Sequence, residues 1–169
     1  MTLIPRFIEA GQSFKTVQRY QSRTLYTDGS YDHGVAGWAV VEDGECIHQD
    51  WGRGVTSNMA EGHALVAALR LVRGVPATIL TDSQGWVSAI TQSKKVKGKG
   101  AKEILDEALN LFHSQIELVW VPAHTGVIAG NELADSYAKE ARLNKRTSPA
   151  YAGLGITSQH GFPDLKRRA

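Results

Sequence analysis

The chain has 169 residues, of which 42% are hydrophobic and 21% charged, and its formal net charge is +2. This length is typical of one domain and is enough to bury a substantial core. No apolar run approaches the roughly 18 residues that a membrane-spanning helix needs. The single cysteine, Cys46, excludes an internal disulfide. Because the first residues also lack the pattern of a secretory signal, we expect a cytosolic protein.

Positive charge is concentrated in short stretches although the net charge is small. Residues 93–102 read SKKVKGKGAK, with five lysines and no acid, and further basic residues occur in 142–146 and 166–168. Lysine runs are often solvated loops, but they also form patches that bind polyanions. The charge pattern leaves both interpretations open and makes nucleic acid a candidate partner.

The first half of the chain predicts an antiparallel meander of three strands. Residues 1–23 are weakly patterned and could form a short helix, an edge extension of a sheet or a disordered arm. Residues 24–28, 38–42 and 45–51 are rich in β-branched and aromatic residues, which favour strands. Asp43-Gly44, between the second and third of these strands, is a strong hairpin turn signal.

The second half alternates helical and strand patterns. Ser57 or Asn58 could cap the first helix, and Gly74 to Pro76 would end it. The expected elements are helix 59–72, strand 77–81, helix 83–91, helix 101–113, strand 116–121 and helix 132–142. The order βββ-α-β-α-α-β-α predicts an α/β fold of mixed α+β character, with a five-stranded mixed sheet and flanking helices.

Four acidic residues fall near the ends of these predicted elements. Asp28 ends the first strand and Asp82 follows the fourth, so parallel pairing of those strands would place both side chains at one carboxyl edge of the sheet. Glu61 and Asp135 fall in the first turns of two helices. Taken singly, each acid has an ordinary explanation, as a turn residue or as a helix-terminus residue.

Taken together, the four acids indicate a metal site. Mg²⁺ and Mn²⁺ prefer hard oxygen ligands, and two such ions about 3.5–4 Å apart need shared carboxylates. We therefore expect Asp28, Glu61, Asp82 and Asp135 to bind two Mg²⁺ ions, with Mn²⁺ as a possible substitute, and to cleave a phosphodiester. His124, on the loop after the last strand, could transfer protons at neutral pH or could be an ordinary exposed histidine.

Five short motifs occur in order: YTDGS at 26–30, NMAE at 58–61, LTDS at 80–83, WVPAHTG at 120–126 and GNELAD at 130–135. Together they closely resemble type 1 ribonuclease H, over about residues 24–142. The last two are also similar to motifs of the ribonuclease H domains of reverse-transcribing elements. The resemblance divides the chain into an N-terminal extension (1–23), a catalytic domain (24–146) and a C-terminal tail (147–169).

The resemblance implies an endonuclease that cleaves the RNA strand of RNA/DNA hybrids and leaves 5′-phosphate and 3′-hydroxyl ends. Asp28, Glu61, Asp82 and Asp135 match the metal-binding carboxylates, and His124 matches a loop histidine that assists catalysis and product release. The 2′-hydroxyl would mark the scissile strand as RNA, without readout of base sequence. The residues expected to contact the hybrid are Gly29, Ser30, Thr56, Ser57, Asn58, Ser83, Lys94, Lys95, Lys97 and Lys99.

Two departures from the family pattern affect substrate binding. Many members carry a long basic insertion with tryptophan, whereas the lysine segment here is short and has none. We therefore expect either a weaker electrostatic grip on the hybrid or a different basic contact. Trp86 lies one position later than the aromatic residue that commonly stacks on the DNA strand, which leaves its role open. The resemblance implies no membrane and no protein partner, and we expect a monomer.

Two rival functions are compatible with parts of the sequence. A DNA-cleaving nuclease could have the same fold, because a fold alone does not determine a substrate. A non-catalytic hybrid-binding domain would be expected to have lost one of the carboxylates, and all four are present. The intact TDGS and GNELAD motifs favour the ribonuclease over the first rival.

Overall fold

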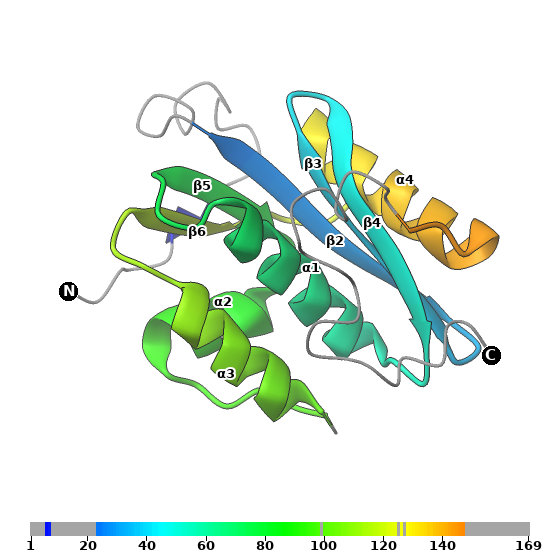
Figure 1. The fold of residues 1–169 in the computed structure, drawn as a ribbon, viewed down its shortest axis with the longest axis horizontal. Coiled ribbons are helices and arrows are strands. Elements are labelled where there is room, and N and C mark those ends of the chain that lie inside the picture. Colours follow the sequence, from blue (N-terminus) through cyan, green and yellow to red (C-terminus); the bar gives the residue numbers. More distant parts are fainter. Residues whose placement is uncertain (1–5, 8–22, 99, 125, 127, 148–169) are drawn as a thin grey trace.

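A computed structural model describes residues 6–7, 23–98, 100–124, 126 and 128–147. Its strands are β1 (Arg6–Phe7), β2 (Thr24–Asp32), β3 (Val35–Glu42), β4 (Glu45–Arg53), β5 (Ala77–Thr81) and β6 (Ile116–Trp120). Its helices are α1 (Ser57–Leu71), α2 (Gln84–Gln92), α3 (Ala101–Leu111) and α4 (Ala129–Asn144). The strands form one sheet in the order β1-β6-β5-β2-β3-β4 (Figure 1).

The sheet is mixed, as the sequence predicts. Strands β2, β3 and β4 form the antiparallel meander, whereas β5 runs parallel to β2 and β6 runs parallel to β5. Both hairpin turns have two residues with positive φ, His33-Gly34 and Asp43-Gly44. Left-handed conformations at both central positions match the twist of paired strands. The turn expected at Asp43-Gly44 is therefore confirmed.

The end of the first strand of the meander was predicted wrongly. β2 does not stop at Asp28 but continues to Asp32, so Gly29 and Ser30 belong to the strand. The chain turns instead at His33-Gly34. Gly29 lacks a side chain because α1 packs against it, and not because the chain turns there. Asp28 therefore lies in the middle of a long strand.

A short sixth strand lies at the edge of the sheet, beyond the five that were predicted. β1 pairs with β6 in parallel, with Arg6 in register with Val119 and Phe7 with Trp120. Of the three possibilities for the N-terminal segment, these two residues form an edge extension. Most of the predicted extension and tail, 1–5, 8–22 and 148–169, lies outside the described residues. The proposed division into extension, domain and tail stays a prediction.

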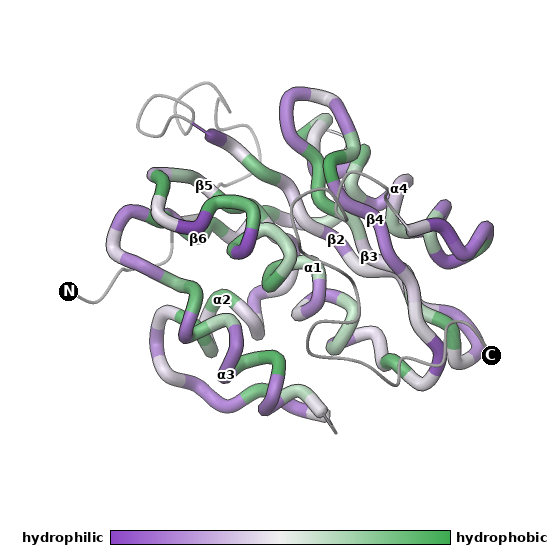
Figure 2. Tube along the Cα trace, viewed as in Figure 1, coloured by the Kyte–Doolittle hydropathy of each residue, from purple (hydrophilic) through white to green (hydrophobic). Residues whose placement is uncertain are grey.

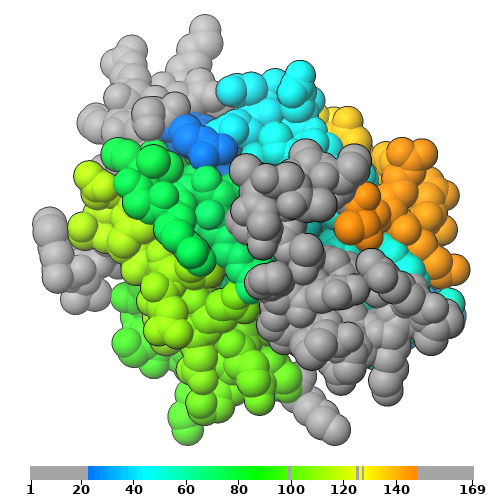
Figure 3. Space-filling model, in the orientation of Figure 1, coloured from blue at the N-terminus to red at the C-terminus, as the bar shows by residue number. Residues whose placement is uncertain are grey.

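Helices cover both faces of the sheet. Helix α1 packs on β2 and β3 and carries α3 on its outer side, whereas α4 packs on the same strands from the opposite face (Figure 1). The segments of α2 and α3 and the C-terminal end of α4 lie at opposite sides of the space-filling view (Figure 3). None of the helices in the described part of the chain combines the length and hydropathy that a bilayer crossing requires.

Of the three hydrophobic clusters among the described residues, the two largest lie on opposite faces of the sheet. The larger cluster lies under α1, α2 and α3 and includes Leu65, Ile79, Trp86 and Ile104. The smaller one lies under α4 and includes Tyr26 and Leu80, among others. Strand β5 is buried along its whole length, as expected for a parallel strand covered on both faces, and it is mostly hydrophobic in Figure 2. The central strands, which position Asp28 and Asp82, are therefore packed on both faces.

Candidate metal centre

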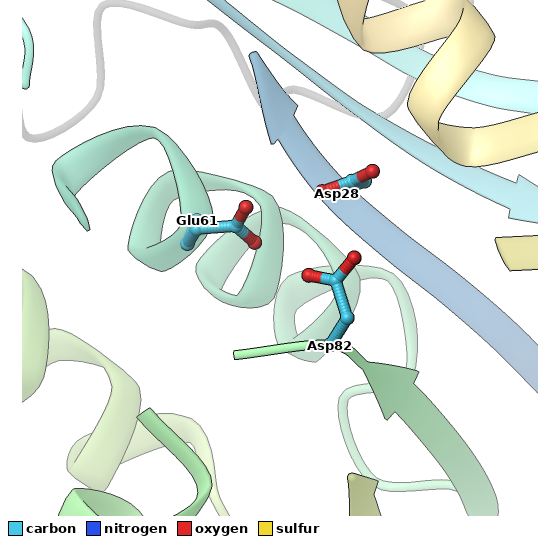
Figure 4. Close-up of side chains that lie close together, drawn as sticks. All are labelled: Asp28, Glu61 and Asp82. Carbon is cyan, nitrogen blue, oxygen red and sulfur yellow. The ribbon is translucent and has the colours of Figure 1, made fainter. Parts of the chain in front are cut away.

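Three of the four predicted carboxylates meet where β5 ends beside the middle of β2. Each of Asp28, Glu61 and Asp82 contributes an oxygen atom, and these atoms all lie within 4.8 Å of one another (Figure 4). Asp28 stands on β2, Glu61 on α1, and Asp82 directly after β5. The parallel pairing on which the proximity of Asp28 and Asp82 depends is present, with Thr27 opposite Thr81. Asp28 directly follows Thr27 and Asp82 directly follows Thr81, so the two residues emerge side by side.

Glu61 reaches the site because α1 lies unusually close to β2. A Cβ atom at Gly29 would be 2.7 Å from the Glu61 amide nitrogen, which is closer than real Cβ contacts allow. Gly29 directly follows Asp28, so this close approach brings the two carboxylates together. Glu61 lies in the second turn of α1, not in the first as predicted, because Thr56 caps the helix by accepting a hydrogen bond from the Met59 amide at 3.2 Å. A capping role for Glu61 is thereby excluded.

The three acids strongly affect one another's ionisation. Burial, and after it the charge of Asp82, raises the pKa of Asp28 to about 7. Burial and the charge of Asp28 raise the pKa of Glu61 well above its ordinary value, and the two side chains are hydrogen-bonded to each other. Clustered carboxylates repel one another when ionised, and a shared proton relieves that repulsion. Without a cation, Asp28 and Glu61 therefore share a proton at neutral pH.

The donor set fits a divalent cation. The Glu61 Oε2 atom is buried and has no hydrogen-bond partner among the described residues. A buried carboxylate oxygen without a donor is costly unless a positive charge compensates it. Within the described ranges, these residues are the only group of three or more acidic, histidine or cysteine side chains close enough to hold an ion. Oxygen ligands alone are the set that Mg²⁺ and Mn²⁺ prefer.

Asp135 and His124 lie near this cluster but are not part of it. Asp135, on α4, accepts a hydrogen bond from Lys139 Nζ at 2.6 Å, and its negative charge helps to raise the pKa of Asp28 and Asp82. His124 is exposed on the loop after β6, with a φ of 53°. The charge of its imidazole opposes the rise in the pKa of Asp82. Both residues are thus close enough to affect the ionisation of the site.

Comparison with known proteins identifies the family of the chain. The family model for RNase H matches residues 20–142. The chain belongs to the ribonuclease H family. The predicted family membership, and with it the class of hydrolases, is confirmed.

Sequence relatives of this ribonuclease H chain include viral Pol polyproteins. The Pol polyprotein of equine infectious anemia virus (isolate 1369) is 31% identical over 139 residues, which cover 79% of this chain and 11% of the polyprotein. The polyprotein of strain Wyoming is 30% identical over the same shares of the two chains. The chain therefore spans about a tenth of the length of these curated relatives.

Solved ribonuclease H structures share the fold. The N-terminal RNase H domain of Rv2228c from Mycobacterium tuberculosis is 26% identical, with a TM-score of 0.57, and the match covers 71% of this chain and 98% of that one. The RNase H1 from Halobacterium salinarum is 25% identical, with a TM-score of 0.53 and coverage of 73% and 98%. LC11-RNase H1, solved in complex with an RNA/DNA hybrid, is 20% identical, with a TM-score of 0.56 and coverage of 73% and 99%.

Several residues expected to contact a hybrid make contacts within this ribonuclease H domain. The Ser30 hydroxyl accepts a hydrogen bond from Arg142 Nε at 2.9 Å. The Asn58 amide donates to the Lys97 carbonyl at 2.5 Å. Ser83 is the N-cap of α2. Ser57 is exposed at the start of α1. Contact between these residues and a hybrid stays a prediction.

The lysine segment connects α2 to α3. Lys94, Lys95 and Lys97 are exposed, and Lys99 lies outside the described residues. The Asn58–Lys97 hydrogen bond ties the segment to the first turn of α1. Gly100 also lies close to this turn, because a Cβ atom there would be 2.9 Å from Cε of Met59. The backbone of Lys97 is therefore held at the N-terminal end of the helix that carries Glu61.

Two residues that support Asp82 were not singled out from the sequence. The side-chain amide of Asn131 donates a hydrogen bond to the Asp82 carboxylate, which opposes the rise in its pKa. The indole N–H of Trp120 donates to the Asp82 carbonyl at 3.1 Å. Asn131 is 2% exposed, so it is a buried polar residue inside the GNELAD motif. A polar residue that falls on the buried side of an otherwise amphipathic helix is the signal that could have identified it.

Proposed function

We propose that this domain is an endoribonuclease that cleaves the RNA strand of RNA/DNA hybrids with the help of two Mg²⁺ ions. The observation that carries the proposal is the convergence of Asp28, Glu61 and Asp82 from three separate elements within 4.8 Å, in a chain of the ribonuclease H family. The hybrid bound to LC11-RNase H1, which has the same fold, supports the choice of substrate. Mn²⁺ is expected to replace Mg²⁺, since both prefer oxygen ligands.

The three carboxylates would hold the ions. When bound, two divalent ions supply an activated water and stabilise the charge that develops at phosphorus and on the leaving oxygen. Asp28 and Glu61 must release their shared proton before both can bind a cation, which couples metal affinity to pH. Asp135 would contribute charge from the rim, and its hydrogen bond with Lys139 would have to open if it were to bind an ion directly.

Asn131 and Trp120 would orient Asp82, and His124 would move protons. The Asn131 amide fixes the Asp82 carboxylate, and the Trp120 indole fixes its backbone. Such supporting hydrogen bonds hold a ligand in one orientation and favour its ionised form. The exposed imidazole of His124, whose charge acts on Asp82, would protonate a leaving oxygen and assist release of the product. Cleavage would leave a 5′-phosphate and a 3′-hydroxyl.

The hybrid would lie across the N-terminal end of α1. Small polar residues at that end, Thr56 to Asn58, and Ser83 suit contacts with sugar and phosphate. The exposed lysines of the α2–α3 connection would attract the phosphate backbone. Because only the 2′-hydroxyl distinguishes RNA from DNA at a given position, contact with it would select the strand that is cut.

Substrates with separately labelled strands test the proposal. With Mg²⁺, the protein should cut the RNA strand of a hybrid and leave its DNA strand and duplex DNA intact. The new ends should be a 5′-phosphate and a 3′-hydroxyl, and a chelator should stop the reaction. Cleavage of duplex DNA would favour the DNA-cleaving rival. Binding of the hybrid with its RNA left intact would favour the non-catalytic one.

A further inference from the structure

Trp86 links α2 to the helix that carries Glu61. It follows Asp82 by four residues and its side chain is completely buried. Its indole N–H donates a hydrogen bond to the Asn58 carbonyl, in the first turn of α1, at 2.7 Å. Because the ring is enclosed by the protein, it cannot stack on a DNA strand. The role that its sequence position left open is therefore an internal one, in contact with α1.

Gly62 is where α1 meets Trp86. A Cβ atom at Gly62 would overlap ring carbon Cζ2 of Trp86 and would lie 2.8 Å from Cγ2 of Ile104 on α3. Three helices therefore meet at a position that has room for a hydrogen atom only. Asn58 and Gly62 are four residues apart and lie on one face of α1, and Glu61 lies in the turn between them. The indole thus contacts the turn of the helix that presents the carboxylate.

The same turn is bounded by β2 on its other side. A Cβ at Gly29 would lie 2.7 Å from the Glu61 amide nitrogen and from the Ala60 carbonyl carbon. The turn is therefore clamped between the strand of Asp28 and the ring of Trp86. We infer that Trp86, packed on Gly62, is a positioning residue that sets the location of Glu61 in the metal centre. This inference rests on the proposed function, because it assumes that Glu61 binds a cation.

Small shifts of this turn should have large effects on the cation. Productive sites tolerate displacements of about 0.5 Å, and removal of a supporting residue typically costs 10–100-fold in metal affinity. A residue that only fills the core would behave differently. Its replacement would lower thermal stability but would leave the metal affinity of the folded protein unchanged.

The test uses variants of the two contacting residues and a neighbouring control. Gly62→Ala should push α1 away from α2, and Trp86→Phe should remove the hydrogen bond to Asn58 and reduce the ring. Mn²⁺ affinity is measured by calorimetry and the melting temperature of the metal-free protein by circular dichroism. We expect each variant to bind Mn²⁺ about 10-fold or more weakly, at temperatures where it is folded. Gly85→Ala, whose added Cβ meets no atom within 4 Å, should bind like the wild type.

The double variant Gly62→Ala/Trp86→Phe gives the sharpest result. The smaller ring makes room for the added methyl group, so the double variant should bind Mn²⁺ more tightly than Gly62→Ala alone. If Gly62→Ala does not fold, the Mn²⁺ affinity of Trp86→Phe still tests the inference, because this variant retains an aromatic ring in the core. If every single variant that folds bound Mn²⁺ with wild-type affinity, the inference would be overturned, whereas the proposed function would stand. A wild-type protein that neither binds Mn²⁺ nor cuts a hybrid would overturn the proposed function and the inference with it.

Discussion

Asp28 and Glu61 illustrate how burial changes the chemistry of a common side chain. Asp28 is 3% exposed, and its pKa of about 7 contrasts with an ordinary value of 3.8. The cause is first desolvation and then the neighbouring charge of Asp82. A cation between the carboxylates would offset both the desolvation and the charge repulsion and would lower the pKa of Asp28, because it favours the ionised form. In the metal-free protein the ionised carboxylates would therefore repel one another, and a bound cation would offset this repulsion.

The raised pKa of Asp28 predicts how the stability of the metal-free protein changes with pH. Between pH 4 and 7 the folded state holds a proton that the unfolded state has lost, so stability must fall as pH rises through this range. The melting temperature without metal should drop by roughly 5 °C or more between pH 5 and pH 8. Asp28→Asn should flatten this profile, and Mg²⁺ should raise the melting temperature at pH 8. Identical profiles for the wild type and Asp28→Asn would contradict the assigned ionisation.

At the scale of elements, glycines determine how closely the helices approach the sheet. Gly29 allows α1 to pack closely on β2, and Gly37 allows α4 to pack closely on β3. A Cβ atom at Gly37 would overlap the Ala138 carbonyl oxygen. Gly130 at the start of α4 packs on the ring of Tyr26. These positions are extended or helical rather than left-handed. The absence of a side chain is needed there for close packing and not for a turn.

Replacement of Gly37 should therefore be costly. In Gly37→Ala the added methyl meets the backbone of α4 at Ala138 and Arg142, which cannot move without displacing the helix. We expect a loss of about 1–3 kcal/mol in the free energy of unfolding, measured by urea denaturation. Gly85→Ala, in open space on α2, serves as the matched control and should be nearly neutral. Equal stability of the two variants would show that α4 does not pack as described.

The order and type of the elements could be predicted from local patterns. The Asp43-Gly44 turn has a local physical cause, and the uniformly buried strand β5 was predicted with its observed bounds. The predicted end of β2 was wrong because a glycine such as Gly29 can indicate either a turn or close packing against a helix, and the local sequence does not distinguish the two. The cap of α1 was assigned to Ser57 or Asn58 although Thr56 performs it, since three adjacent residues are all good caps.

The candidate site was predictable where it depended on strand pairing. The proximity of Asp28 and Asp82 was conditional on parallel pairing of their strands, and β2 and β5 are parallel neighbours. The support of Asp82 by Asn131 could not be derived, because the two residues are brought together only when α4 packs on the sheet. The same holds for Trp86, whose partner Asn58 lies 28 residues earlier on another helix. Such contacts depend on tertiary packing, which local patterns do not encode.

At the scale of the whole molecule, the acidic centre lies beside a basic segment. The exposed Lys94, Lys95 and Lys97 lie on one connection, and its Lys97 carbonyl accepts a hydrogen bond from Asn58 in the first turn of α1. A polyanion drawn to these lysines would be delivered to the end of the helix that presents Glu61. This arrangement suits a substrate that binds through its phosphates and is cut at a metal centre.

Neutralising the lysines should change the salt dependence of binding. Replacement of Lys94, Lys95, Lys97 and Lys99 by Gln should weaken hybrid binding and reduce the slope of log Kd against log salt by about one for each phosphate that is no longer neutralised. Fluorescence anisotropy at several salt concentrations measures both quantities. Lys102→Gln is the control, because its Nζ is paired with Asp106 at 2.9 Å. An unchanged slope in the fourfold variant would mean that the segment is a solvated loop.

The most direct test of the central claim is the rate of RNA-strand cleavage in Asp28→Asn and Asp82→Asn at saturating Mg²⁺, with the Kd for the hybrid measured alongside. If these carboxylates form the metal centre, cleavage should fall at least about 100-fold in each variant, whereas the Kd should stay within about threefold of the wild-type value. Asp106→Asn, an exposed acid on α3, should retain the wild-type rate. Near-normal turnover in either of the first two variants would contradict the assignment of the metal centre.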